Sequence, residues 1–296
     1  MKVCINEKEY EYKKNAMKDY SDRESYFHLT QNIFNLDFGP WYESGYADDS
    51  FIPYTLYDGH IAVASVGVVT SEFRWKNKKT RFSQISTVMT LPKYRGNGLN
   101  RWLLESALEE YRSSDLIYLY ANDSVCSYYP RFGFERMTEY AFHMPVIRGN
   151  GSYRKLDLKN PIDVALLTEK YMNFNNPFSA LTMEHNLSQM MFHCITFLYD
   201  NIYYMEQYDA VVIAAHEADT IFCYDIYSSG EGCISDILST LATENTTSVV
   251  LGFTPMDAIG FVAEPSKEPD TTIFTLKSPV NPFKEDQVTF PFMSRA

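Results

Sequence analysis

Apolar and polar residues in the first half of the chain recur with the periods of helices and strands. Around Tyr26 and Ile33 the apolar positions have helical spacing, whereas later apolar runs are rich in β-branched and aromatic residues and end at turn residues such as Asp58-Gly59. Helical spacing predicts an amphipathic helix, and apolar runs bounded by turn residues predict strands. In chain order, the pattern predicts a helix at 22–37, strands at 51–56, 61–73 and 80–90, a helix at 99–113 and a strand at 116–121.

The second half follows a similar order of elements. Residues 135–146 are predicted to supply the last strands of a first domain, and 148–152 has the Gly- and Ser-rich composition of a linker. Beyond it, the pattern predicts helices at 163–174 and 187–191, strands at 201–205, 210–215 and 220–227, a helix at 234–242 and a strand at 248–253. We interpret 248–253 as the counterpart of 116–121 in an internal repeat.

Two glycines, Gly96 and Gly98, lie between the strand predicted at 80–90 and the helix predicted at 99–113. A helix N-terminus has unpaired N–H groups and a partial positive charge, and glycines allow a loop to bring several amides against a phosphate. The pattern therefore predicts a pyrophosphate site, although an ordinary strand-to-helix turn would contain the same glycines. Residues 228–232 of the second half include two glycines but no basic residue, which makes them a poor pyrophosphate site.

A second motif follows the strand at 116–121. Its residues are Asn122, Val125, Tyr129, Gly133 and Phe134. Together with Arg95, Gly96 and Gly98, this spacing resembles the GNAT superfamily of acyl-CoA-dependent N-acetyltransferases over roughly residues 20–147. Lys93 and Asn100 depart from the residues usual in that family.

More narrowly, 98–101 and 129–134 resemble the enhanced-intracellular-survival type of acetyltransferase. Members of that type join a catalytic GNAT domain to a degenerate second one. The resemblance implies an α/β (α+β) fold with a mixed, mostly antiparallel GNAT sheet flanked by helices. It implies a catalytic domain at 1–147 and a degenerate, GNAT-like α/β domain at 153–296.

The resemblance also implies how acetyl-CoA binds. The strand at 80–90 is expected to be bulged and to diverge from 116–121, so that pantetheine enters the gap and pairs with backbone groups of Val88 and Thr90. No metal ligand is expected. The implied cofactor-binding residues are Val88, Met89, Thr90, Arg95, Gly96, Asn97, Gly98, Leu99, Asn100, Arg101 and Asn122.

Acetyl transfer to an amine needs an acid for the departing thiolate and a proton acceptor for the amine. The resemblance implies Tyr129 as the acid, with Tyr128 as an alternative. Cys126 has no His at a defined spacing to activate it, so we expect a buried structural thiol.

The proton acceptor is open at this point, because 82–88 contains no acidic residue where many family members have a Glu. Direct binding of the neutral amine would need no such group. Otherwise the proton acceptor is a water chain ending at Glu43, Asp48 or Asp49, or the carboxylate of Ala296, which the enhanced-intracellular-survival type suggests. The loop predicted at 39–49 would form an aromatic, anionic amine pocket or would simply cap the core.

Composition narrows the range of functions. A chain of 296 residues is typical of two domains, and its net charge of −12 disfavours nucleic-acid binding. The charge suits a cationic amine substrate, although it would equally keep a protein soluble. The five cysteines have neither disulfide-scaffold nor metal-site spacing, and we expect no membrane span and a cytoplasmic location. A homo-oligomer is compatible with the sequence.

Two functions are consistent with these features. The first is an N-acetyltransferase in which a primary amine attacks acetyl-CoA directly in a ternary complex. Its acceptor would be a small polyamine or aminoglycoside, or alternatively a protein or peptide lysine. The second is a CoA-binding sensor or scaffold that has lost acetyl transfer.

Overall fold

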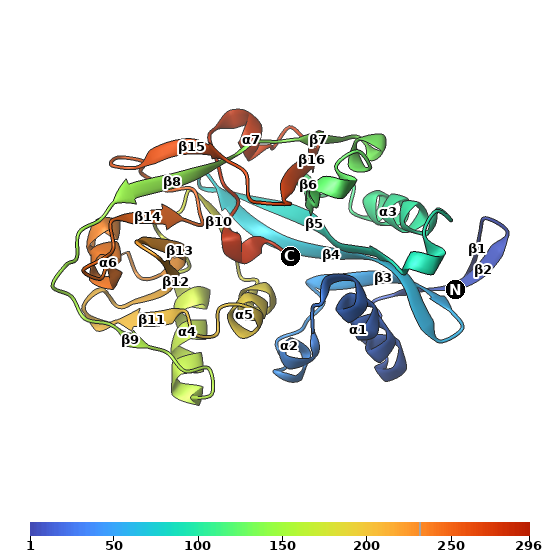
Figure 1. Ribbon diagram of the computed structural model, residues 1–296, viewed down its shortest axis with the longest axis horizontal. Helices are drawn as coiled ribbons and strands as arrows, with labels where there is room; N and C mark the ends of the chain where they lie inside the picture. The colour runs from blue at the N-terminus through green and yellow to red at the C-terminus, as the bar shows by residue number, and fades with distance from the viewer. Residues whose placement is uncertain (231) are drawn as a thin grey trace.

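The computed structural model describes residues 1–230 and 232–296 and contains two sheets, each covered by helices (Figure 1). Glu231, in the predicted segment 228–232, lies outside the described residues. The helices are α1 (Tyr20–Phe34), α2 (Gly39–Glu43), α3 (Leu99–Glu110), α4 (Pro161–Asn173), α5 (Leu187–Thr196), α6 (Ile234–Leu241) and α7 (Pro282–Glu285). Short 3-10 helices are η1 (Pro92–Tyr94), η2 (Asp123–Val125), η3 (Tyr129–Phe132), η4 (Glu206–Tyr208) and η5 (Phe292–Ser294).

The first sheet has the order β1-β2-β3-β4-β5-β6-β16-β7, with β10 paired to β4. All neighbours are antiparallel except β5 and β6. The fold class implied by the resemblance is therefore confirmed. The strands are β1 (Lys2–Ile5), β2 (Lys8–Lys14), β3 (Phe51–Asp58), β4 (Ile61–Trp75), β5 (Lys78–Thr90), β6 (Leu116–Ala121), β7 (Phe134–Arg136), β10 (Leu181–Glu184) and β16 (Thr272–Leu276).

Helices cover both faces of the first sheet. Leu99, Leu103 and Leu104 of α3 pack on one face, and α1 and α2 lie against the other (Figure 1). The Asp19 carboxylate caps α1 by accepting from the backbone N–H groups of Ser21 (3.0 Å) and Asp22 (3.2 Å). We refer below to the side that bears α1 and α2 as the α1 face.

The second sheet has the order β15-β8-β14-β13-β12-β11-β9 and repeats the central topology of the first. In both sheets a strand, a helix and a parallel strand follow one another, as β5–α3–β6 and as β13–α6–β14. The internal repeat predicted from 116–121 and 248–253 is therefore confirmed at the level of topology. The strands are β8 (Glu139–Pro145), β9 (Arg154–Lys155), β11 (Ile202–Met205), β12 (Ala210–Glu217), β13 (Thr220–Tyr227), β14 (Ser248–Leu251) and β15 (Val262–Ser266).

The two sheets exchange one strand each. β8 leaves the first half of the chain and pairs with β14 and β15, whereas β16 returns from the second half and pairs with β6 and β7. The prediction that 135–146 supplies the last strands of a first domain was therefore wrong for β8. Strand pairing depends on which edge a strand reaches in space, and local periodicity does not contain that information. The boundaries 1–147 and 153–296 stay a prediction.

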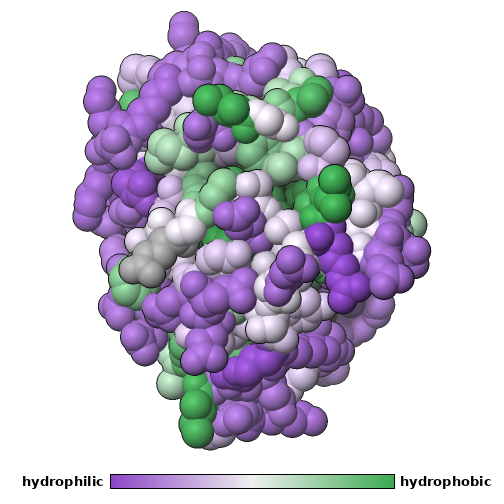
Figure 2. Space-filling model, turned by 90° about the vertical axis from the view of Figure 1, so that its left-hand side faces the viewer, coloured by the Kyte–Doolittle hydropathy of each residue, from purple (hydrophilic) through white to green (hydrophobic). Residues whose placement is uncertain are grey.

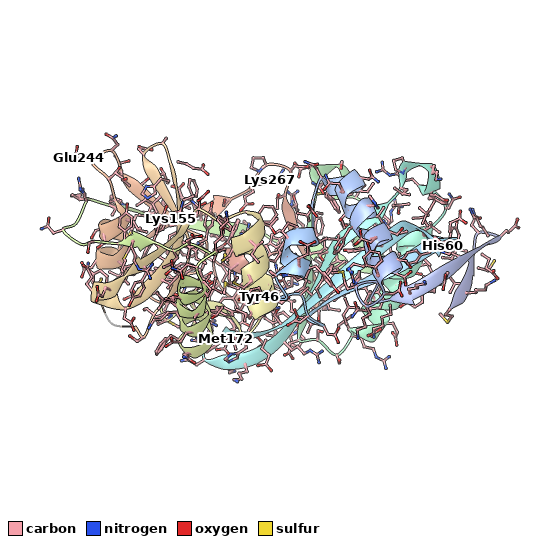
Figure 3. All side chains as sticks on the ribbon, turned by 90° about the horizontal axis from the view of Figure 1, so that it is seen from below. Tyr46, His60, Lys155, Met172, Glu244 and Lys267 are labelled. Atoms are coloured by element: carbon pink, nitrogen blue, oxygen red, sulfur yellow. The ribbon has the colours of Figure 1, made fainter. Side chains whose placement is uncertain are left out.

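Other contacts join the two halves on the α1 face. Trp41 is buried, donates from Nε1 to the Ser188 carbonyl (3.0 Å) and packs its ring against Phe192 of α5. Tyr46 packs against the cores of both halves and lies between them in Figure 3. The aromatic residues of 39–49 thus supply core, with the short helix α2 inside the predicted loop, because burying large aromatic surfaces stabilises the contact between the halves.

The outer face of the second half is mostly hydrophilic (Figure 2), in keeping with the acidic net charge. Among the described residues, no helix has the length and hydropathy needed to span a bilayer.

Candidate active site

A gap opens between the two parallel strands at the centre of the first sheet. β5 and β6 pair from Phe82–Leu116 to Ile85–Leu119, and no pairing continues beyond that point. β5 has a bulge against β4 between the pairs Ser65–Met89 and Gly67–Ser86. The divergence and the bulge implied by the resemblance are both present.

The bulge depends on an unusual backbone conformation at Thr87. Its φ is 42°, a left-handed value that β-branched residues rarely adopt. Gly67 faces the bulge, and a Cβ there would lie against Thr87 Oγ1 and 2.7 Å from Phe51 Cε2. Gly67 therefore allows the close approach of β4 that holds the bulge, a requirement that the sequence alone did not reveal.

The loop above the gap has the geometry of an anion-binding site. Gly96 and Gly98 have φ values of 80° and 77°, and a Cβ at either position would meet no atom within 4 Å. Gly98 is the N-cap of α3, and no side chain caps the helix, so the N–H groups of its first turn are available to a ligand. These features fit a CoA pyrophosphate bound at a helix N-terminus.

Neighbouring side chains shape the loop. Arg95 donates from Nε to the Thr90 carbonyl (3.2 Å), and Asn97 Nδ2 donates to the Tyr94 carbonyl (3.1 Å). Asn100 Oδ1 is buried and has no partner among the described residues, which leaves an unused acceptor beside the loop. Arg101 is exposed and pairs with Glu105 at 2.9 Å, so it lies on the outer side of α3. The predicted cofactor-binding residues from 95 to 101 thus surround one helix N-terminus.

Val88, Met89 and Thr90 form the β5 side of the gap, and Asn122 follows the end of β6 on the other side. Met89 is buried under α1. The Asn122 side chain donates from Nδ2 to Asp270 Oδ2 (2.8 Å). A side-chain contact of Asn122 with a cofactor would therefore compete with Asp270, a residue of the second half that the sequence did not indicate.

Tyr129 lies at the start of η3 and is buried, with a relative exposure of 5%. It packs with Leu119 and Phe274 in the core on the α3 side of β6 and β16. Burial raises the pKa of Tyr129 above its usual value, so the phenol stays protonated at neutral pH. A protonated hydroxyl is what proton donation to a thiolate requires. Cys126 is half-buried rather than buried as expected, because it is in a short surface turn and contacts the Asn122 carbonyl (3.6 Å).

The last residue of the sequence lies at the centre of the molecule on β5 (Figure 1). Gln84 is 1% exposed, and its Nε2 donates to Ala296 O (2.9 Å) while its Oε1 accepts from Ala296 N (3.0 Å). Gln84 is one residue before Ile85, the last residue of β5 that pairs with β6. The structure thus places Ala296 beside the end of the gap at which the pairing of β5 and β6 stops. We call residues 289–296 the tail.

Residues of α5 and the second sheet hold the tail in place. Phe292 N donates to the Gly252 carbonyl at 2.7 Å, and its ring packs against that of Tyr224 at a tilt of 37°, with centroids 4.4 Å apart. His193 Nε2 and Gln189 Nε2 both contact the Arg295 carbonyl, at 2.6 and 2.8 Å. A carbonyl can only accept, so His193 carries its proton on Nε2.

Arg295 is enclosed by acidic and aromatic groups. Its guanidinium pairs with Glu268 (2.5 Å) and Glu139 (3.2 Å) and lies 5.0 Å from the ring centroid of Tyr120. Tyr120 follows Leu119, where the pairing of β5 and β6 ends, and its hydroxyl donates to Glu139 (3.1 Å). This cluster connects the tail to the β6 side of the gap.

The acidic residues considered as proton acceptors in the loop at 39–49 have other contacts. Asp49 accepts from Asn15 (2.8 Å) and Lys18 (3.3 Å), and Asp48 Oδ1 accepts from the backbone of Ser50 (2.8 Å). Glu43 is exposed at the end of α2. All five cysteines are free, and the described residues include no group of three or more His, Cys, Asp or Glu side chains placed to hold a metal.

A gap between parallel strands below an uncapped, glycine-led helix N-terminus is a geometry that suits a phosphate-bearing cofactor. Residues 21–137 match the family model of the acetyltransferase (GNAT) domain. This part of the chain is therefore a GNAT domain. No curated protein sequence matches the chain significantly.

Solved structures extend the likeness to both halves. A probable N-acyltransferase from Enterococcus faecalis is 13% identical with a TM-score of 0.57, covering 90% of this chain and 72% of that one. Eis1 from Mycobacterium abscessus is 11% identical with a TM-score of 0.55, covering 88% and 73%. A GCN5-related N-acetyltransferase from Anabaena variabilis is 13% identical with a TM-score of 0.57, covering 90% and 72%. The fold is thus Eis-like, with two GNAT-like halves.

The buried His193 makes the stability of this site depend on pH. Burial lowers the pKa of His193 to about 4, so the unfolded chain binds more protons than the folded chain between pH 4 and 6.5. Stability should therefore be complete above pH 6.5 and fall as the pH drops towards 4, by roughly 2 kcal/mol between pH 7 and 5. We expect urea unfolding to show this loss, and His193→Gln, which keeps an N–H donor but does not titrate, to reduce it. Equal losses in both proteins would contradict the prediction.

Proposed function

We propose that the protein transfers the acetyl group of acetyl-CoA to a primary amine by direct attack in a ternary complex. The observation that carries this proposal is the gap between β5 and β6 directly below the N-terminus of α3. Positioning both substrates in one gap replaces a bimolecular encounter and supplies much of the rate.

The residues of the loop and gap fit CoA as the acyl donor. Backbone N–H groups of residues 96–100 would bind the pyrophosphate, and the unpaired edges of β5 after Ile85 would bind the pantetheine amides. Bound acetyl-CoA would supply a thioester whose carbonyl carbon is open to attack by an amine.

The proton transfers are assigned to Ala296 and Tyr129. In a chain that ends at Ala296, the terminal carboxylate is negatively charged at neutral pH, so it would attract an ammonium group and accept its proton. The Tyr129 hydroxyl would donate a proton to the departing sulfur as the carbon–sulfur bond breaks. Ala296 is exposed.

The test of the acid is Tyr129→Phe. We expect kcat to fall about 100-fold, because general acid catalysis contributes on that scale. The Kd for CoA should stay within about twofold, since the hydroxyl makes no contact with the phosphate loop. The matched control is Tyr128→Phe at the neighbouring, half-buried position, which should keep most activity. Unchanged turnover in Tyr129→Phe would remove Tyr129 from the mechanism.

The whole proposal is tested by thiol release from acetyl-CoA across a panel of polyamines, aminoglycosides, amino acids and lysine peptides. Release that depends on one amine class supports acetyl transfer to that class. If no amine in the panel causes thiol release while calorimetry confirms CoA binding, the proposal is overturned in favour of a CoA-binding sensor.

A further inference from the structure

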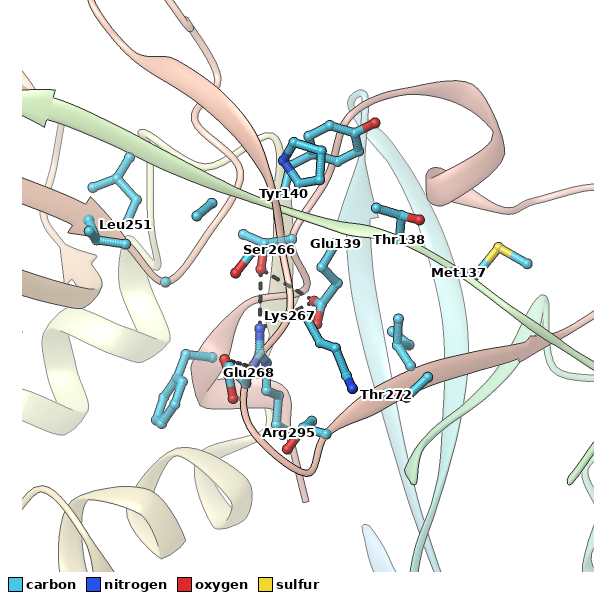
Figure 4. A pocket seen from close by; sticks show the side chains of 18 of the residues that line it. Met137, Thr138, Glu139, Tyr140, Leu251, Ser266, Lys267, Glu268, Thr272 and Arg295 are labelled. Carbon is cyan, nitrogen blue, oxygen red and sulfur yellow. Dashed lines mark hydrogen bonds and ion pairs between the residues drawn. The ribbon is translucent and has the colours of Figure 1, made fainter. Parts of the chain in front are cut away.

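A cavity of about 530 Å³ lies between the two sheets, next to the exchanged strands. Its walls come from β8, β15, β13 and β14 on one side and from β16 on the other, and the tail contributes Phe292 and Arg295 (Figure 4). The volume is within the range of small-molecule sites. No step proposed above uses this cavity.

One wall of the cavity is apolar. Phe222, Tyr224 and Val250 alternate along β13 and β14 with residues of the core under α6, so they face away from that core and line the cavity. Ile273 of β16 and the ring of Phe292 add further apolar surface to the lining. A ligand with an apolar or aromatic body would displace water from these surfaces and gain from their burial.

Charged groups of both signs line the rest of the cavity. Glu268 pairs with Arg295 but its side chain is half exposed, so it has lone pairs free for a second cation. On the other side Lys267 pairs with Asp123 at 2.9 Å, while Arg136 is exposed and has no ion pair among the described residues. Three basic and two acidic side chains line the cavity, so it does not select for a polycation.

The cavity is one strand away from the gap. Thr272 and Ile273 line it and pair with Ala121 and Tyr120, the last two residues of β6. Adjacent strands are about 5 Å apart. The cluster of Arg295, Glu139 and Tyr120 lies between the cavity and the gap, so the end of the cavity that Arg295 and Glu139 line is the end nearer the gap.

We propose that this cavity holds the acceptor, and that the acceptor is a small zwitterion with an apolar body, such as an apolar amino acid or dipeptide with a free α-amine. Its ammonium group lies toward Glu268 and Glu139, at the end of the cavity that Arg295, the neighbour of Ala296 in the chain, lines. Its carboxylate lies toward Arg136 and Lys267, and its side chain on Phe222 and Tyr224. The inference deepens the proposed function and rests on it. A lysine on a folded protein would present a cation without a carboxylate and would leave the basic side of the cavity unused.

The test is calorimetry on the full chain without CoA, using L-phenylalanine, phenethylamine and 3-phenylpropionate as probes. These three share an aromatic body and differ in their charges. We expect phenylalanine to bind at least tenfold more tightly than either singly charged probe. Equal or tighter binding of phenethylamine would overturn the zwitterion assignment.

Two variants locate the binding. Val250→Trp should fill the apolar wall and abolish binding of phenylalanine, and Glu268→Gln, a half-exposed position that keeps the shape, should weaken it severalfold. The control is Val262→Trp on β15, where the side chain is 53% exposed outside the cavity. CoA affinity should stay the same in all three, which also reports that they fold. Unchanged binding of phenylalanine in both cavity variants would overturn the proposal.

Assays of acetyl transfer to different amines test this inference and the proposed function separately. Transfer to phenylalanine or a phenylalanyl dipeptide that Val250→Trp abolishes supports both. Transfer to other amines but to no zwitterion overturns the acceptor assignment and leaves the proposed function standing. Transfer to no amine at all overturns the proposed function, whatever the cavity binds.

Discussion

A chain shortened by Ala296 should bind CoA as tightly as the full chain and transfer acetyl groups at least about 100-fold more slowly. In the full chain, Gln84 holds the backbone of Ala296 by two hydrogen bonds, and Arg295 occupies its own enclosure of acidic and aromatic groups. The deletion moves the terminal carboxylate back to Arg295. The carboxylate then leaves Gln84 and lies where the Arg295 carbonyl contacts His193 and Gln189.

The measurement is kcat together with the Kd for CoA, on protein whose mass confirms Ala296 as the last residue. A chain extended by one glycine is the matched variant, because it keeps every tail side chain but replaces the Ala296 carboxylate with an amide. We expect the same loss of kcat. Gln84→Leu should cause a smaller loss, since the carboxylate stays present but is less well positioned. Full activity in the extended chain would exclude the terminal carboxylate as the proton acceptor.

The local elements of this fold could be predicted from the sequence because they depend on nearby residues. The strand at 116–121 coincides with β6, and the predicted strands at 51–56, 61–73 and 80–90 lie within β3, β4 and β5. Each is an apolar run that ends at turn residues, so periodicity and turn chemistry agree. The hairpin of β1 and β2 was not among the predicted elements, although charged and apolar residues alternate along it as they do in half-exposed strands.

The sequence indicates the candidate site where the backbone conformation requires a particular residue type. Gly96 and Gly98 are examples, because each occupies a left-handed conformation that other residues avoid. The contacts of Ala296 with Gln84 and of Asn122 with Asp270 join residues more than a hundred positions apart. Gln84 was visible only as a polar residue in an apolar strand, and nothing local indicated its partner.

The exchange of β8 and β16 makes each sheet depend on a strand from the other half of the chain. β16 covers the free side of β6, and the loop before it supplies Asp270 to the start of η2. The second sheet also holds the tail, since Gly252 accepts from Phe292 where β14 would otherwise extend. A Cβ at Gly252 would lie 3.1 Å from Phe292 Cβ, so the glycine leaves room for this contact. The second half thus acts as a support that completes the sheet and positions the tail.

The second large effect is expected at the phosphate loop. Gly98→Val should raise the Kd for CoA about 100-fold or more. The glycine has a φ of 77°, and a β-branched residue there would shift the backbone to a negative φ and turn the first-turn amides away from the pyrophosphate. No protein atom lies within 4 Å of the added Cβ, so a steric clash inside the protein is not the cause.

Gly59→Val is the control that distinguishes a loss of CoA binding from the destabilisation that backbone strain causes anywhere in the protein. Gly59 forms the turn between β3 and β4 with a φ of 62°, and an added Cβ there also meets no atom within 4 Å. Each substitution should therefore reduce the free energy of unfolding by a similar amount, about 1–3 kcal/mol. Only Gly98→Val should lose affinity for CoA in calorimetry, because Gly98 and not Gly59 adjoins the helix amides that would bind the phosphates. Equal CoA affinity in the two variants would mean that the cofactor binds elsewhere, and the gap between β5 and β6 would lose its assigned role.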